Sequence, residues 1–121
     1  MAQTIAKMLD EGINELDELE ALGKILAVSV KTSQIRKFFG SLKRIQADFK
    51  NKSNEIILLE PRLAYAYGKA KGEATKAGLK QLYETLGPLV KSIKQDKIRF
   101  TRFVQISEAI VAYHKSNGGS E

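Results

Sequence analysis

The chain is 121 residues long, 43% of them hydrophobic, and it contains no cysteine. These values fit one globular domain and exclude a disordered chain, a disulfide framework and a thiolate metal site. The net charge of +6 is unevenly distributed: residues 1–30 hold six acids and two lysines, and eighteen basic and eight acidic residues follow, so a polyanionic partner is expected to contact the chain after Val30.

The N-terminal part of the chain predicts an acidic helix. Residues 1–12 are a short start interrupted by Gly12, and apolar residues then recur at helical spacing to about Val30. They are Leu16, Leu19, Leu22, Ile25 and Leu26. Asn14 is expected to cap this helix, with acids in its first turn where the helix dipole favours them. The acidic face fits a solubilising surface, a surface that repels nucleic acid, or one that docks a basic face of a neighbouring subunit.

Residues 34–49 predict a second helix with a basic exposed side, opened by Thr32 and Ser33 as caps. Its apolar stripe consists of Ile35, Phe38, Phe39, Leu42, Ile45 and Phe49. Cations recur at steps of seven on the two flanks of this stripe. They are Arg36, Lys43 and Lys50 on one flank, and Lys37 and Arg44 on the other. The pattern indicates a helix that buries one side and presents positive charge to solvent.

Gly40 lies inside this basic helix, where glycine costs about 1 kcal/mol relative to alanine. A small residue at this position indicates either close packing or close approach of a ligand. Its angular position near the polar side slightly favours the ligand.

A polar break at residues 50–54 precedes an apolar run that we interpret as helix, and Pro61 then suits the first turn of a new helix. On that helix Arg62, Tyr65 and Lys69 share one face, a combination that can neutralise phosphate and stack on a base. The alternative is that Tyr65 and Tyr67 are half-buried aromatics with solvated hydroxyl groups.

The last part of the chain predicts two more helices. Residues 72–78 are weak, either a loop or a fraying helix, and a helical stripe then continues past Gly87 and Pro88, where a kink is expected. Asp96 is expected to cap the final helix. The buried face expected for that helix is Ile98, Phe103, Ile106, Ile110 and Tyr113. The cations crowded at its start are Lys94, Lys97, Arg99 and Arg102. Because cations at a helix N-terminus oppose the dipole, this cluster suggests an anionic partner, although solvent also tolerates it.

The predicted fold class is therefore all-α: a compact bundle of five or six helices, with no sheet, in a single domain of residues 1–121. Residues 116–121 are expected to form a disordered tail. No apolar run approaches the ~20 residues of a membrane span and the start is no signal peptide, so a soluble, cytoplasmic protein is expected.

Catalytic and cofactor chemistry has little support in the sequence. The single histidine, His114, falls near the apolar face of the last helix, where a structural role is favoured over a general base. There is no glycine-rich phosphate loop and no metal-ligand pattern. We expect no enzyme activity, no cofactor and no metal.

Three segments together resemble the small helical subunit of the type III-A CRISPR–Cas (Csm) effector complex. They are TSQIRKFFGSLKRIQ, EPRLAYAYGKAKG and FTRFVQISEAIVAYHK, at residues 32–46, 60–72 and 100–115. The order and spacing of the segments match that family across most of the chain after Lys31.

The resemblance implies a non-catalytic subunit of an antiviral ribonucleoprotein, present in several copies stacked head to tail beside the guide RNA and the target RNA. Base pairing with the guide reads the sequence in such complexes, so this subunit needs only to hold the RNA backbone. The RNA-binding residues that it implies are Arg36, Lys37, Lys43, Arg44, Lys50, Arg62, Tyr65, Lys69, Lys94 and Arg102. Partners would be other subunits of the complex and further copies of the chain, with no membrane.

Two other functions fit the residues less well. A helix-turn-helix DNA-binding protein would use the basic helix as its reader, but Gln34 and Arg36 are the only base-reading candidates near its start. A scaffold subunit would use the same cations to bind acidic protein partners.

Overall fold

The computed structural model describes residues 4–119. Within them the chain is helical and contains no strand, so the predicted all-α fold class is confirmed. The helices of two turns or more are α1 (Ile5–Glu11), α2 (Asp17–Ser29), α3 (Thr32–Ala47), α5 (Leu59–Lys69), α6 (Glu73–Ile93) and α7 (Lys97–Ser116). A single turn, α4 (Phe49–Lys52), and a 3-10 helix, η1 (Ser53–Leu58), connect α3 to α5.

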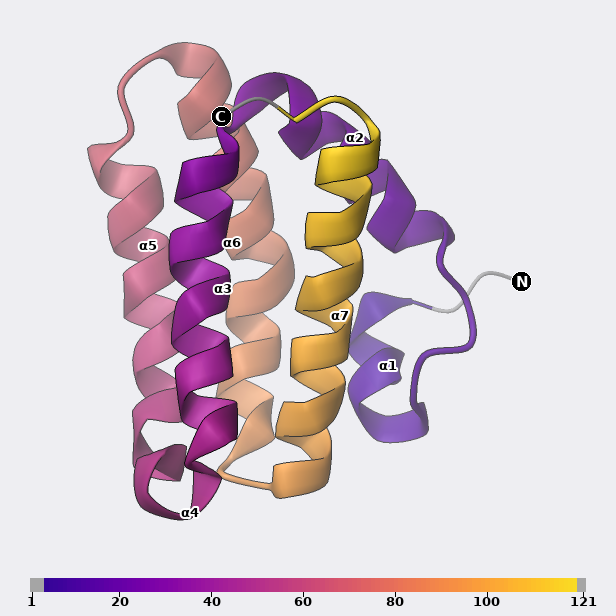
Figure 1. Cartoon of the computed structure of the whole chain (residues 1–121), viewed down its shortest axis with the longest axis vertical. Helices are drawn as coiled ribbons and strands as arrows, with labels where there is room; N and C mark the ends of the chain where they lie inside the picture. Colours follow the sequence, from indigo (N-terminus) through magenta and orange to yellow (C-terminus); the bar gives the residue numbers. More distant parts are fainter. Residues whose placement is uncertain (1–3, 120–121) are drawn as a thin grey trace.

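Four helices, α3, α5, α6 and α7, lie roughly side by side and form the body of the bundle (Figure 1). Helix α2 crosses one end of this body and contacts α7 and α6, while α1 packs beside α7. Helix α4, η1 and the turn between α6 and α7 close the opposite end (Figure 1). The bundle therefore has two different ends and one long side on which α3 and α5 are neighbours.

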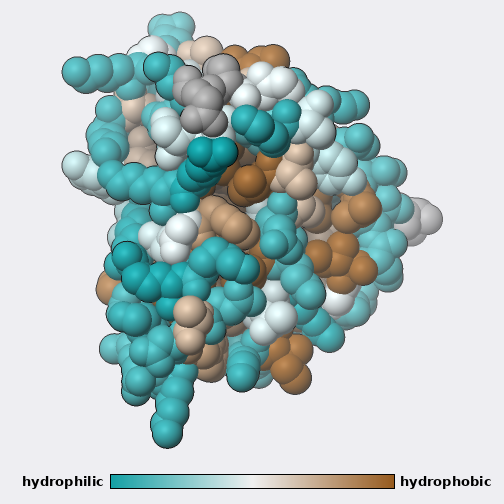
Figure 2. Space-filling view, viewed as in Figure 1, coloured by the Kyte–Doolittle hydropathy of each residue, from teal (hydrophilic) through white to brown (hydrophobic). Residues whose placement is uncertain are grey.

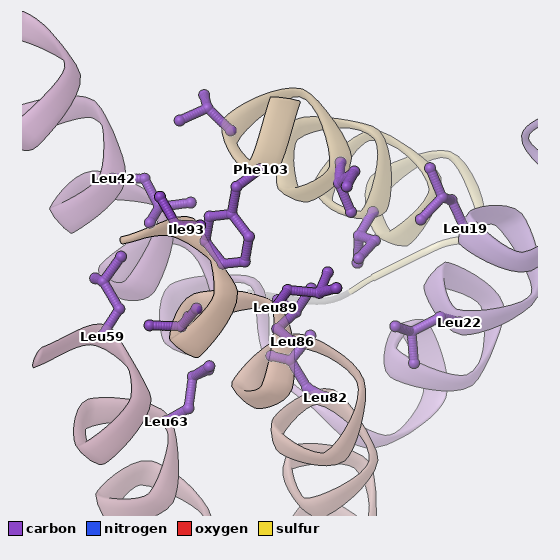
Figure 3. Packing of buried hydrophobic residues seen from close by; sticks show 14 of the residues in the cluster. Leu19, Leu22, Leu42, Leu59, Leu63, Leu82, Leu86, Leu89, Ile93 and Phe103 are labelled. Atoms are coloured by element: carbon purple, nitrogen blue, oxygen red, sulfur yellow. The ribbon is translucent and has the colours of Figure 1, made fainter. Parts of the chain in front are cut away.

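One continuous core joins these helices (Figure 3). Phe103 of α7 is fully buried and lies near Ile93 of α6 and Leu42 of α3. Leucines from α5 and α2, such as Leu63 and Leu22, close the core at its sides. Each long helix presents one apolar stripe to this core, as the helical spacing predicts. The opposite sides of α3 and α5 are therefore left to solvent.

The start of α2 differs from the prediction. Asn14 lies in the non-helical segment before Asp17, so its assignment as the cap is wrong. Instead the carboxylate of Glu15 accepts hydrogen bonds from the backbone N–H groups of Leu16 (2.9 Å) and Asp17 (3.1 Å). The apolar stripe is also narrower than predicted, because Leu16 is 46% and Ile25 39% exposed.

Helix α3 begins at Thr32, whose side chain is buried and does not cap the helix. The side chain of Gln34 accepts the backbone N–H of Lys31 (3.2 Å) and so satisfies one donor near the helix start. The helix ends at Ala47 because Asp48 leaves helical geometry, at φ −139° and ψ 54°. Phe49 therefore belongs to α4, although its ring still packs against Phe100, with 5.8 Å between ring centroids.

Residues 73–78, for which the sequence is compatible with both a loop and a helix, are the first turns of α6. Gly78 is buried where α6 crosses α2, and a Cβ at this position would clash with Ser29. The glycine is thus needed for close helix packing rather than for a loop. Helix α6 continues through Pro88 to Ile93.

The last helix begins as predicted, because the Asp96 carboxylate accepts the backbone N–H of Arg99 at 2.9 Å. The burial of Ile98 is a wrong prediction, since its side chain is 65% exposed. Ser116 is still helical, and the backbone N–H of Gly119 donates to the carbonyl of His114 (2.9 Å), so the expected disordered tail does not begin at 116. Residues 120–121 lie outside the described part.

Candidate nucleic-acid interface

Helix α3 carries four basic residues and no acid along its 16 residues. Arg36, Lys37, Lys43 and Arg44 are all exposed, whereas Ile35, Leu42 and Ile45 are buried on the opposite side. Residues seven apart on a helix lie on the same face, roughly 10 Å along the axis. The four cations therefore form two pairs that run along the outer side of α3.

The neighbours of α3 show where each pair points. Phe38 lines a small hollow with Leu82 of α6 and with Ile110 and Val111 of α7, so its ring lies toward the core. Phe39 is half-buried, and the ammonium of Lys43 lies 5.8 Å from the centroid of its ring. Arg36 shares the flank of Lys43. Arg36 and Lys43 thus lie beside the half-buried Phe39, and Lys37 and Arg44 point away from the core.

The cations of helix α5 lie on the flank of this helix that is directed toward α3. Tyr67 stacks on Tyr83 of α6, with 6.1 Å between ring centroids, and this contact defines the flank of α5 that faces α6. Arg62 and Lys69 are exposed and lie on the opposite flank of α5, toward α3. Because α3 and α5 are neighbours, their cations lie along one side of the bundle.

Tyr65 lies beside these cations and is 67% exposed. The ammonium of Lys69 lies 5.0 Å from the centroid of its ring, within the range of a cation–π contact. Tyr65 is therefore a free-standing aromatic at the surface, whereas Tyr67 is the half-buried one. The alternative that both tyrosines are half-buried is correct only for Tyr67.

We define the basic face as this set of six cations and one tyrosine: Arg36, Lys37, Lys43, Arg44, Arg62, Tyr65 and Lys69. Figure 2 shows that the surface over α5 and α3 is predominantly hydrophilic. Among the described residues, no Asp or Glu forms an ion pair with Lys37, Lys43 or Arg44. The one acid of α5, Glu60, is engaged on the other flank with Tyr83 and Lys91. At Lys37, Lys43 and Arg44 the face thus carries positive charge that no acid among residues 4–119 pairs with.

Gly40 lies between the two pairs of cations on α3, and a Cβ built at this position would have no atom within 4 Å. Close packing within the chain, one of the two explanations for this glycine, is therefore excluded. The backbone is bare at the middle of the basic face, so a ligand held by the surrounding cations can approach it closely.

Three of the ten predicted site residues do not lie on this face. Lys50 belongs to α4, because the break at Asp48 removes it from the flank of Arg36 and Lys43. Lys94 is the left-handed residue (φ 51°) that ends α6, at the same end of the bundle. The structure therefore divides the predicted set between one side and one end of the bundle.

Arg102 has a structural role. Its guanidinium donates to the backbone carbonyls of Leu9 (2.8 Å) and Asp10 (2.7 Å), which are unpaired at the C-terminal end of α1. Arg99, one turn away, forms an ion pair with the Asp10 carboxylate. The cations that crowd the start of α7 thus serve partly to hold α1, an explanation that sequence spacing alone did not reveal.

The structure also contains a polar cluster that sequence reasoning missed. The Tyr83 hydroxyl donates to Glu60 (2.9 Å), and the Lys91 ammonium lies 3.6 Å from the same carboxylate, at the edge of a cleft of about 240 Å³ between α5 and α6. The hydrogen bond to Glu60 raises the pKa of the Tyr83 phenol above its usual value. These residues are far apart in sequence, so only the packing of α5 on α6 could identify them.

No catalytic arrangement emerges from the described residues. His114 is buried and its Nε2 lies 2.7 Å from the Val30 carbonyl, which confirms its structural assignment. Residues 4–119 contain no group of His, Asp and Glu side chains that could hold a metal ion. None of their helices is long and apolar enough to cross a bilayer.

The fold and this surface define a class: a small all-helical protein with a basic face on two neighbouring helices. The sequence profile of the family described as Csm2 Type III-A matches residues 2–120. The chain therefore belongs to this family, the small subunit of the type III-A CRISPR–Cas Csm complex. No curated protein and no solved structure matches the chain.

Proposed function

We propose that this chain holds the RNA backbone within the Csm complex, by means of the basic face and without regard to base sequence. The observation that carries this proposal is the exposure of Lys37, Lys43 and Arg44 on a helix that lacks acids. Phosphate neutralisation by lysine and arginine supplies sequence-independent affinity. Guide RNA and target RNA are the polyanions of such a complex, and base pairing between them supplies the sequence specificity.

The geometry of the face suits a strand rather than a single ion. The cations of α3 are spaced along roughly 10 Å of the helix axis, and those of α5 run beside them. Tyr65 offers a stacking surface beside Lys69, and base–aromatic stacking is worth about 1–3 kcal/mol. Lys43 of α3 and Arg62 of α5 provide positive charge on two neighbouring helices.

A single copy offers few cations to the phosphates, so its affinity for RNA is expected to be weak. In the complex, several copies stacked head to tail would bind one RNA together, and multivalency would raise retention by orders of magnitude. The subunit is non-catalytic in this proposal, and RNA cleavage or nucleotide chemistry belongs to other subunits. We place the complex in the cytoplasm.

A triple variant, K37A/R44A/R62A, tests this function in the isolated full-length chain. We expect this variant to bind single-stranded RNAs more weakly than the wild type does. The affinity should fall by a similar factor for RNAs of unrelated sequence. The salt dependence of log K should also become flatter, by roughly 0.7 for each phosphate that the variant no longer neutralises. Fluorescence anisotropy over a series of salt concentrations measures both. The matched control is K7A/K24A/K80A, which removes three exposed lysines from α1, α2 and α6.

Each rival function predicts a different outcome of this experiment. Equal RNA affinity of the two triple variants would reject the basic face and favour a scaffold that binds acidic proteins. Sequence-specific protection of duplex DNA in footprinting would favour a helix-turn-helix reader. The position of α3 between α5 and α7 argues against that reader, since a recognition helix must enter the major groove.

A further inference from the structure

The cleft between α5 and α6 is formed by residues that the proposed RNA contact does not use. They are Glu60 of α5 and Tyr83, Glu84, Gly87, Pro88 and Lys91 of α6. The cleft lies on the flank of α5 that faces α6, whereas the cations of the basic face on α5 lie on the opposite flank. Glu84, Pro88 and Lys91 are exposed, so the cleft is accessible from solvent.

Pro88 leaves a hydrogen-bond acceptor at the wall of this cleft. In an α-helix the carbonyl of residue 84 accepts the N–H of residue 88, and proline has no N–H to donate. Helix α6 nevertheless continues through Pro88 to Ile93. The Glu84 carbonyl therefore lacks its usual donor within the helix and can accept a donor from another molecule.

Two carboxylates border the cleft, and each can accept further donors. The Tyr83 hydroxyl and the Lys91 ammonium both contact Oε2 of Glu60, and a carboxylate offers about four lone-pair sites. The Lys91 side chain is 66% exposed and its ammonium lies 3.6 Å from Oε2, so this contact contributes little and is easily displaced. Among residues 4–119, no lysine or arginine forms an ion pair with Glu84.

The charges around the cleft favour a cationic ligand. The two carboxylates of Glu60 and Glu84 and the ammonium of Lys91 give the lining a net charge of −1. Lys80 lies one turn before Glu84 on the same side of α6, where it is exposed and weakens the negative potential without lining the cleft. RNA is disfavoured here, because the carboxylates repel phosphate.

The size and the walls of the cleft suit one long side chain. Its volume of about 240 Å³ is smaller than the roughly 300–1,000 Å³ of sites for drug-sized molecules. Between the carboxylates the walls are the Tyr83 ring, the Pro88 ring and the backbone of Gly87. Arginine fits these walls better than lysine, because its planar guanidinium stacks on aromatic faces and its N–H groups match a carboxylate in pairs.

We propose that this cleft receives an arginine side chain from a different subunit of the Csm complex. In this contact the guanidinium donates to the carboxylates of Glu84 and Glu60 and to the Glu84 carbonyl, and its flat face packs on Tyr83. Membership of the Csm2 family places the chain among such subunits. The contact is independent of RNA binding, because it uses the flank of α5 opposite to the basic face.

Competition for incorporation into the complex tests this contact. Equal amounts of the wild-type chain and a differently tagged variant are mixed with the other subunits and guide RNA, and mass spectrometry measures their ratio in the purified complex. E84Q removes a charge that has no ion pair within the described chain, so its fold should be unchanged. We expect E84Q to be depleted roughly tenfold, because hydrogen bonds to a charged acceptor are weakened. The control is E108Q, which neutralises an exposed glutamate of α7 and should incorporate like the wild type.

G87A tests the shape of the cleft instead of its charge. A Cβ at Gly87 would lie 3.4 Å from the Tyr83 ring, which is an ordinary contact distance, so the variant should fold. Its melting temperature should be no lower than that of the wild type, because alanine favours the helix. The added methyl group occupies the cleft, so G87A should also be depleted in the competition.

Crosslinking identifies the source of the arginine. The chain has no cysteine, so Q81C provides a single thiol for a benzophenone label, one turn before Glu84 and outside the cleft lining. Irradiation of the complex should join this label to an arginine-containing segment of a different subunit. When that arginine is replaced by glutamine, the wild type and E84Q should incorporate equally.

Each contrary result overturns the proposal. These results are E84Q that incorporates as well as E108Q, a crosslink only to another copy of the chain or to RNA, and E84Q that stays depleted when the partner arginine is replaced. RNA binding by isolated E84Q should not fall below that of the wild type. Failure of the cleft contact is therefore distinguished from failure of the RNA-binding function.

Discussion

At the scale of single residues, His114 links the last helix to the end of α2. Its ring is buried, and Nε2 lies 2.7 Å from the Val30 carbonyl at the junction of α2 and α3. Replacement by alanine leaves a buried carbonyl without a partner and opens a cavity, so we expect H114A to lower the free energy of unfolding by about 2–4 kcal/mol. Urea titration measures this change. A loss no larger than that of K80A, an exposed control, would contradict the structural role.

Substitution by alanine should change the stability of the chain in opposite directions at two glycines, Gly23 and Gly40. A Cβ at Gly23 would clash with Tyr113 and lie 3.1 Å from the backbone nitrogen of His114, whereas Gly40 has open space around it. G23A should therefore destabilise the chain by about 1–3 kcal/mol through overpacking between α2 and α7. G40A should stabilise it by about 1 kcal/mol through helix propensity. Thermal unfolding of both variants measures the two changes in stability. If both changes had the same sign, the packing of α2 on α7 would be refuted.

The Tyr83 phenol provides a pH-dependent prediction. The hydrogen bond to Glu60 raises its pKa in the folded chain, so its contribution to stability is present below the unfolded pKa of about 10 and is lost as pH rises through the folded pKa. In tyrosine-labelled NMR, Tyr83 should ionise above the ordinary phenol pKa of about 10, and E60Q should lower its pKa. An unchanged titration of Tyr83 in E60Q would show that the contact with Glu60 does not persist in solution.

At the scale of secondary-structure elements, sequence periodicity predicted the helices but not their ends. The stripe of Ile35, Leu42 and Ile45 is buried on α3 as the spacing indicates. The break at Asp48 left no clear signal, because the apolar spacing continues through it to Phe49. Ile98 was assigned to the buried face of α7, but at 100° per residue it lies on the side of exposed Gln105, away from Phe103 and Ile110. An apolar residue near a helix end is therefore buried only where its angular position matches that of the stripe.

The predicted cations lie on different surfaces for a related reason: local spacing does not show which helices are neighbours. Arg36 and Lys43 could be placed together from spacing alone, because both lie on one helix. The roles of Arg102 and Lys94 depend on where α1 and α4 pack, and a local pattern does not carry that information. Helix spacing thus predicts a site within an element better than a site assembled from several.

Arg102 and Arg62 offer a direct comparison of a structural arginine with an arginine that we propose to contact RNA. R102A removes two hydrogen bonds from a charged donor to the carbonyls that end α1, which should cost roughly 1.5–3 kcal/mol. Hydrogen exchange of α1 should accelerate, while RNA affinity changes little. R62A should have the reverse profile: reduced RNA affinity with unchanged α1 protection. Equal effects of the two variants on RNA binding would show that Arg102 also contacts RNA.

At the scale of the whole molecule, charged residues are distributed unevenly over the surface. Six acids and two lysines precede Val30, in α1, α2 and the segment between them, and eighteen basic and eight acidic residues follow it. Folding places α2 across one end and α3 with α5 along one side (Figure 1). The sequence predicted this separation of charge, and the structure adds that the cations of α3 and α5 share one side. This layout leaves the side with α3 and α5 available for the RNA contact that we propose.

The central claim, that the basic face contacts RNA in the Csm complex, is tested most directly by photo-crosslinking. RNA containing 4-thiouridine is bound in the assembled complex, irradiated and digested, and the crosslinked peptides are identified by mass spectrometry. We predict crosslinks within residues 36–44 and 62–69, with Tyr65 a favoured aromatic acceptor, and their loss in K37A/R44A/R62A. Crosslinks confined to α1, α2 or the turn between α6 and α7 would contradict the account.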